Sequence, residues 1–195
     1  MMLPTLLFAL AASQANGTDP LNAAVAAAQR SGSPTWLSWS VPSAAEGEAC
    51  CWNSRDSRHE RSCSLTGDNH GMNMSREDGG PVDATLIIYA RVDRSGVDAL
   101  RAYSSTCRVD RGAERIQEVA NVTPSHSVAW LETLARGGDA GRASKRRSDG
   151  AVSAIALHDD QSADAALERI AKTGDAKQIR HAAAFWLGNT RGQAG

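Results

Sequence analysis

The chain has 195 residues, a formal net charge of −1 and 42% hydrophobic residues. This length fits one domain or two small ones, with a core of ordinary size. The near-zero charge argues against a strongly basic nucleic-acid-binding protein and against an acidic disordered tail, so no nucleic-acid partner is expected. The composition is that of a globular protein and does not indicate a particular reaction.

The first fifteen residues have the pattern of a secretory signal peptide. The run Leu3–Ala12 is uncharged and mostly apolar, and Ser13-Gln14-Ala15 has the small-x-small spacing of a signal-peptidase site. No stretch reaches the roughly 18 apolar residues of a transmembrane helix. We predict cleavage near Ala15, a periplasmic or secreted protein, and no integral membrane segment in the mature chain. The alternative is a buried N-terminal helix, because the segment lacks Lys and Arg.

Export determines how the cysteines are interpreted. In an exported protein, the four residues Cys50, Cys51, Cys63 and Cys107 are expected to form two disulfides. A bond between the neighbours Cys50 and Cys51 would be strained, which leaves two pairings open. These are Cys50–Cys63 with Cys51–Cys107, or Cys51–Cys63 with Cys50–Cys107.

Residues 16–136 predict a cysteine-containing α+β domain with a small antiparallel sheet. Its elements follow from capping residues, turn residues and the alternation of apolar side chains. In chain order, we expect a helix from Asp19-Pro20 to Gly32, a strand at 35–41, a polar loop at 53–81, a hairpin of strands 83–93 and 97–104, a third segment at 116–122, and a helix from Thr123-Pro124 to Gly137. Four tryptophans near these elements are expected in the core: Trp36, Trp39, Trp52 and Trp130.

The C-terminal part is predicted to be all helical. Residues 137–150 are rich in Gly, Ser and basic residues, which favours a linker and a domain boundary. Three helices follow in residues 151–195: one capped by Asp149, one from Ser162 to Lys172, and one after Asp175. The last helix matches the amphipathic template with Ile179, Ala182, Ala183, Trp186 and Leu187.

These C-terminal helices resemble HEAT repeats, in particular the short bacterial repeats first associated with phycobilisome lyases. The resemblance rests on residues at characteristic positions: Asp159, Asp160, Ala166, Leu167, Ile170, Arg180, Ala182, Ala183, Leu187 and Gly188. The whole chain is also similar to exported bacterial HEAT-repeat domain-containing proteins. The resemblance implies an α-solenoid fragment that binds a protein partner without a cofactor, and it does not imply lyase activity. It implies a repeat core made of Leu167, Ile170, Ile179, Ala183, Trp186 and Leu187.

The chain supplies only about one and a half repeats, whereas about three are usually needed for stability. Two arrangements would solve this: the helices dock on the N-terminal sheet, or the repeats continue in a longer protein. We favour the second, whose signature would be an exposed apolar face on the last helix that includes Trp186.

The alternative function is a metal- or small-ligand-binding module in the loop 50–70. His59 and His70 lie among the cysteines, and zinc is bound by four nitrogen or sulfur ligands. The sequence has no C-x-x-C or H-x-x-x-H spacing, so disulfides and no metal are the favoured interpretation.

A catalytic site is not predicted. Ser125-His126 lacks the context of a nucleophile elbow, and no cysteine stands in a protease signature. His158-Asp159-Asp160 is expected to end one helix and cap the next. Lys145-Arg146-Arg147 is expected to be solvated. We therefore predict an exported, non-enzymatic interaction or scaffold protein.

Overall fold

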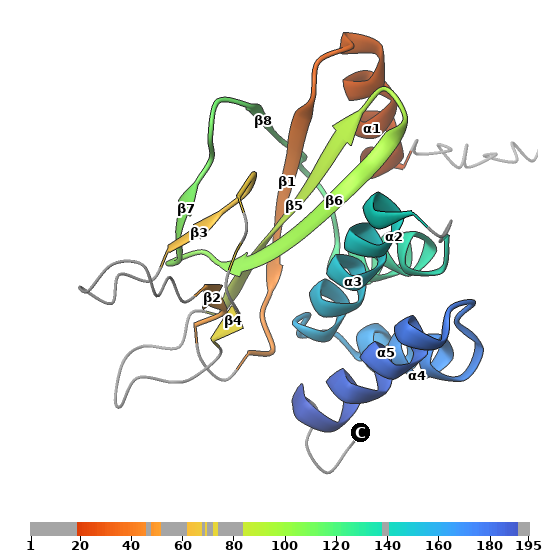
Figure 1. Ribbon diagram of the computed structural model, residues 1–195. Coiled ribbons are helices and arrows are strands. Elements are labelled where there is room, and N and C mark those ends of the chain that lie inside the picture. Colours follow the sequence, from red (N-terminus) through yellow and green to blue (C-terminus); the bar gives the residue numbers. More distant parts are fainter. Residues whose placement is uncertain are drawn as a thin grey trace, which may run out of the picture.

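A computed structural model describes residues 19–45, 48–51, 62–67, 69, 72–73, 84–137 and 141–190. In these ranges the fold has two layers, a central sheet and a group of helices on one of its faces (Figure 1). Two short β-ribbons lie on the other side of the sheet. The predicted signal peptide lies outside the described residues.

The described strands follow one another between a first helix and a run of later helices, the segregated order expected of an α+β protein, and the mixed class is confirmed. In chain order they are α1 (Pro20–Ser31), β1 (Thr35–Pro42), β2 (Cys50–Cys51), β3 (Ser62–Ser64), β4 (Met72–Asn73), β5 (Thr85–Asp93), β6 (Gly96–Ser104), β7 (Arg108–Asp110), β8 (Arg115–Glu118), α2 (Pro124–Arg136), α3 (Arg142–Ala156), α4 (Gln161–Thr173) and α5 (Lys177–Thr190).

The main sheet has the strand order β6-β5-β1-β8. β5 is antiparallel to both β6 and β1, whereas β8 runs parallel to β1, with Thr35 opposite Arg115. The sheet is therefore mixed, and the prediction of a purely antiparallel sheet is wrong. Local alternation identifies a strand but carries no information on the direction of a partner so distant in the chain.

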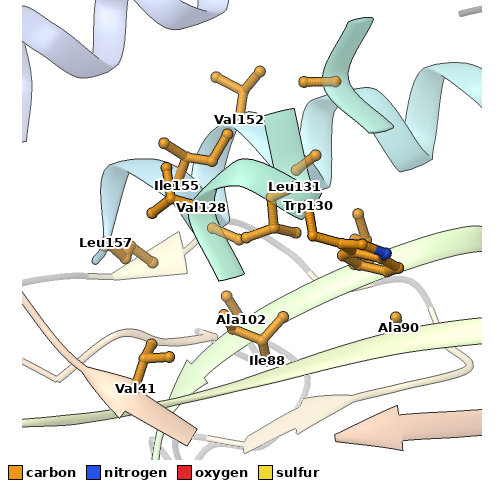
Figure 2. Packing of buried hydrophobic residues seen from close by; sticks show 14 of the residues in the cluster. Val41, Ile88, Ala90, Ala102, Val128, Trp130, Leu131, Val152, Ile155 and Leu157 are labelled. Atoms are coloured by element: carbon orange, nitrogen blue, oxygen red, sulfur yellow. The ribbon is translucent and has the colours of Figure 1, made fainter. Parts of the chain in front are cut away.

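Alternating residues of the sheet face two different environments. Leu37, Trp39, Ile88 and Leu100 belong to a core between the sheet and the helices, and Figure 2 shows Ile88 and Ala102 facing the apolar residues of α2 and α3. On the opposite face, a second cluster contains the four cysteines and four large side chains: Trp36, Leu65, Tyr89 and Tyr103. Helices thus bury one face of the sheet, and the disulfide ribbons cover part of the other.

The segment predicted as a linker, residues 137–150, forms most of helix α3 from Arg142 onward. Asp149 lies inside this helix instead of capping one, and Gly141 is the N-cap. The sequence pattern was misleading because α3 buries small polar residues, Ser144 and Ser148, where a helix usually buries aliphatic ones. Gly150 lies within the helix and does not end it. Because glycine has no Cβ, the helix can approach β6 closely at this position.

The C-terminal helices dock on the sheet through α3, which corresponds to the first of the two arrangements considered above. α3 packs along β6, α2 packs on α3 and α4, and α5 packs on α3 and α4. One continuous apolar cluster runs from Leu21 in α1 to Ala183 in α5 and so includes residues on both sides of the predicted boundary at 137–150.

Among the described helices, none combines the length and apolar character needed to cross a bilayer.

Candidate functional site: a disulfide cluster, a pocket and an exposed helix face

The four cysteines form two disulfides, Cys50–Cys107 and Cys51–Cys63. This is one of the two pairings left open by the sequence, and it confirms that the cysteines are oxidised in this structure. All four side chains are buried, with Cys107 the most exposed at 7%.

Short strands position the cysteines against the sheet. Ala49 exchanges two hydrogen bonds with Ser104 at the end of β6, with N···O distances of 2.8 and 2.9 Å, and this anchors β2. β3 pairs with β7, which places Cys63 opposite Val109 and next to Cys107. The backbone N–H of Cys51 donates to the Cys63 Sγ at 2.8 Å. The two disulfides are therefore packed together in one corner of the fold.

The metal hypothesis has weak support in this geometry. The Sγ atoms of Cys50, Cys63 and Cys107 lie within 4.8 Å of one another, but each is already bonded to another sulfur. A thiolate ligand requires a free sulfur, so the oxidised cluster does not fit zinc. The other two predicted ligands, His59 and His70, lie outside the described residues.

A pocket of about 390 Å³ adjoins the disulfides, between the free edge of β6 and helix α3. The residues that line it include Cys51, Asn69, Arg101 and Arg146. The buried Nε of Arg101 has no hydrogen-bond partner among the described residues. The two arginines outnumber the one carboxylate of the lining, Asp149, so the pocket carries a net positive charge, which suits an anionic group.

Two titratable groups of this pocket are shifted by burial. Burial raises the pKa of Asp149, an effect that the nearby Lys145 partly opposes. Burial also raises the pKa of Tyr103 to about 12, so its hydroxyl stays protonated at neutral pH. That hydroxyl accepts a hydrogen bond of 2.8 Å from the side chain of Asn69, which also bonds to both backbone groups of Ser64. Asn69 thus fixes the loop that carries Cys63 to the sheet.

A buried network of hydrogen bonds joins β1, α2 and the segment that follows α3. Trp39 Nε1 donates to Ser127 Oγ at 2.8 Å, and Ser127 Oγ lies 2.9 Å from His158 Nε2. His158 Nδ1 lies 2.7 Å from the carbonyl oxygen of Ala154. A neutral imidazole that donates from Nδ1 and accepts from the serine hydroxyl satisfies all three groups. Since Ser127 and His158 are 0% exposed, this serine–histidine pair ties the fold together and does not face a substrate.

The other polar candidates have structural roles. Asp160 caps α4 by accepting from the backbone N–H of Ser162, as predicted. His126 lies on the first turn of α2, with its Nε2 3.0 Å from Asp19, the N-cap of α1. Burial raises the pKa of Asp19, but the hydrogen bond with His126 and those from the α1 backbone outweigh it, so this pKa is lowered. Within Lys145-Arg146-Arg147, Arg147 is not simply solvated, since it donates to Val97 and Gly137 carbonyls.

The outer helix α5 presents an uncharged aromatic surface. Phe185 is 61% exposed and contacts Trp186 edge-to-face, with ring centroids 5.6 Å apart. The segment 181–190 contains no Asp, Glu, Lys or Arg, and Ala184 and Gly188 are exposed beside the rings. A Cβ added at Gly188 would meet nothing within 4 Å, so the surface is open there.

Four of the six residues predicted as a repeat core are buried: Leu167, Ile170, Ile179 and Ala183. Trp186 and Leu187 are partly buried against the same core. Trp36, Trp39 and Trp130 are buried as expected, and Trp52 lies outside the described residues.

Sequence reasoning missed the pocket and the Trp39–Ser127–His158 network. Arg101 stood in a strand and Arg146 in an expected linker, so nothing in the pattern brought them together. For His158, the apolar run that precedes it, from Ala154 to Leu157, is the signal that could have indicated burial. No protein-family model, no curated protein and no solved structure matches the chain.

Proposed function

We propose that the protein is an exported, non-enzymatic interaction module that binds a protein partner through the outer face of α5. The single observation that carries this proposal is the exposure of Phe185 on a helix segment without formal charge. Interface cores are depleted of charged residues and enriched in aromatic ones, and this face has both properties.

Two further features support the proposal. Disulfides form and persist in oxidising compartments, which agrees with the secretory signal predicted at residues 1–15. The resemblance of residues 150–190 to HEAT repeats supports a role in protein contacts, because such helices bury their outer faces against the next helix of an array.

The residues exposed on α5 indicate the kind of partner that it would bind. Its exposed side combines Phe185 with the small residues Ala184 and Gly188, which allow another helix to approach closely. Lys177 and His181 are exposed on the N-terminal half of α5, and the helix contains no acidic residue. A complementary partner is an amphipathic helix with an apolar stripe and acidic side chains at one end.

Site-specific photo-crosslinking in the native host tests this proposal. A benzophenone amino acid in place of Phe185 is expected to give one discrete adduct, whose partner peptide is an acidic amphipathic helix when mapped by mass spectrometry. Lys177→Glu in the same background should lower the yield of that adduct, because it reverses the charge that faces the acidic end.

The matched control places the same crosslinker at Lys172, whose side chain is 72% exposed on α4. The proposal is wrong if position 185 gives no adduct, or if position 172 gives the same adduct with equal yield.

A further inference from the structure

The two disulfides are in direct contact. Cys63 Sγ lies 3.6 Å from Cys107 Sγ, although these atoms belong to different disulfides. Cys50 Sγ lies within 4.8 Å of both, whereas Cys51 Sγ is not part of this group of three. A sulfur released from one disulfide would therefore already touch a sulfur of the other. Such proximity is one requirement for thiol–disulfide exchange, and the released sulfur must also turn into line with the bond that it breaks.

The pocket between β6 and α3 gives a route to one end of this sulfur chain. Among the cysteines, Cys51 is the one that lines the pocket. Arg101 and Arg146 line the same pocket together with Asp149, and the net positive charge favours the thiolate form of a thiol that enters. The attacking species and its target are thus brought together at Cys51, one end of the sulfur chain Cys51–Cys63···Cys107–Cys50.

We propose that the four cysteines act as one thiol–disulfide exchange centre, which an anionic low-molecular-mass thiol enters at Cys51. The thiolate attacks Cys51 Sγ, forms a mixed disulfide there and releases the Cys63 thiolate. Cys63 then attacks Cys107 Sγ, which forms a Cys63–Cys107 bond, breaks the Cys50–Cys107 bond and releases the Cys50 thiolate.

A second thiol completes the reaction. It attacks the external sulfur of the mixed disulfide, leaves as the oxidised thiol dimer and frees Cys51. Two thiols are oxidised, two electrons enter the protein, and the two thiol protons are taken up by Cys50 and Cys51. The product carries one disulfide, Cys63–Cys107, and two adjacent free thiols.

The adjacent thiols do not readily pair with each other. Their Cα atoms are held about 3.8 Å apart by a trans peptide bond, below the usual span of about 4.4–6.8 Å for a disulfide. The two thiols therefore do not close a disulfide with each other, and the protein returns to two disulfides only through an external oxidant. This pair of thiols is the functional product of the centre.

Two single-cysteine variants test the contact between the disulfides. In Cys51→Ser, Cys63 is left as a thiol beside the intact Cys50–Cys107 bond. After incubation at pH 8, alkylation with N-ethylmaleimide and peptide mapping should show a substantial fraction with Cys50 alkylated and Cys63–Cys107 bonded. In the matched control Cys63→Ser, the free thiol is Cys51, and only Cys51 should be alkylated.

Exclusive alkylation of Cys63 in Cys51→Ser would overturn the proposal, as would equal scrambling in the Cys63→Ser control. The unmodified protein gives an independent result if either variant fails to fold. After limited reduction with 2-mercaptoethanesulfonate, the species with two free thiols should carry label on Cys50 and Cys51. Label on a native pair instead, either Cys51 with Cys63 or Cys50 with Cys107, would contradict the exchange.

The role of the pocket is tested by the rate of this reduction. Arg146→Gln should slow reduction by the anionic 2-mercaptoethanesulfonate by roughly threefold at low salt and leave reduction by neutral 2-mercaptoethanol unchanged. An equal effect on both thiols, or no effect on either, would show that the thiol does not enter through this pocket.

Discussion

The backbone of Gly150 in α3 lies directly against Leu100 in β6. A Cβ at residue 150 would stand 2.6 Å from the Leu100 carbonyl oxygen and 2.9 Å from its Cβ. Both atoms belong to a rigid, buried part of the sheet, so neither can move aside at low cost. This contact sets how closely the helical layer approaches the edge of the sheet, and it also forms one wall of the pocket.

We expect Gly150→Ala to lower the free energy of unfolding by about 1–3 kcal/mol, because the added methyl group overpacks the α3–β6 contact. Gly188→Ala is the matched control, since it is also helical and has open space around it. There, the better helix propensity of alanine should raise stability by up to about 1 kcal/mol. Urea unfolding of both variants checks this, and equal shifts would contradict it.

Ser127→Ala should lower the free energy of unfolding by about 2–4 kcal/mol, because both Trp39 Nε1 and His158 Nε2 lose their partner in a site that water does not reach. Ser125→Ala, two residues earlier on the exposed side of α2, should change it by less than about 0.5 kcal/mol. Thermal unfolding monitored by circular dichroism distinguishes the two. A loss below 1 kcal/mol for Ser127→Ala would show that the network is not needed for stability.

The two disulfides should differ in what they contribute to stability. Cys50–Cys107 closes a separation of 57 residues, and Cys51–Cys63 closes one of 12. In the chain-entropy model these loops correspond to about 4 and about 3 kcal/mol. The double variant Cys50→Ser/Cys107→Ser should therefore unfold at lower urea concentration than Cys51→Ser/Cys63→Ser. The reverse order would contradict the entropic argument.

Glu132 should make stability depend on pH. Hydrogen bonds from Arg169 on α4 lower its pKa, burial opposes this, and Arg136 adds to the lowering. A carboxyl group whose pKa is lower in the folded state stabilises the fold above its ordinary value of 4.5, and this stabilisation is lost as pH falls from there through the lowered pKa.

We expect Glu132→Gln to flatten the loss of unfolding free energy between about pH 5 and pH 3. Arg169→Gln should flatten it as well, because it removes the larger cause of the shift. If both variants keep the slope of the unmodified protein, the link between α2 and α4 through Glu132 is not a source of acid sensitivity.

The sequence carried enough local information to place most of the regular elements. Asp19-Pro20 and Thr123-Pro124 begin α1 and α2 because cap and proline act within a single turn. Alternation found β1, β5 and β6, and the turn at 94–96 joins the last two as a hairpin. These signals lie within a few residues of the elements they specify, and for that reason they could be identified without the fold.

What the sequence did not reveal depends on contacts between distant segments. The N-terminal half of α3 buries Ser144 and Ser148, so it lacks the aliphatic period that identifies a helix. The choice between two disulfide pairings requires β3 to lie beside β7, which no local pattern specifies. The pocket could not be predicted for the same reason. Arg101 lies on β6 and Arg146 on α3, and the close approach of these two elements depends on Gly150.

The pairing of β1 has a consequence for the order of folding. Thr35 pairs with Val92 on one side and with Arg115 on the other, so both neighbours of β1 are distant in the chain. The β5–β6 hairpin is local, and local contacts form with a smaller loss of loop entropy. Although β1 is the first strand of the main sheet to be synthesised, we expect it to join a hairpin that has already formed, and the sheet to be complete only when β8 arrives at its far edge.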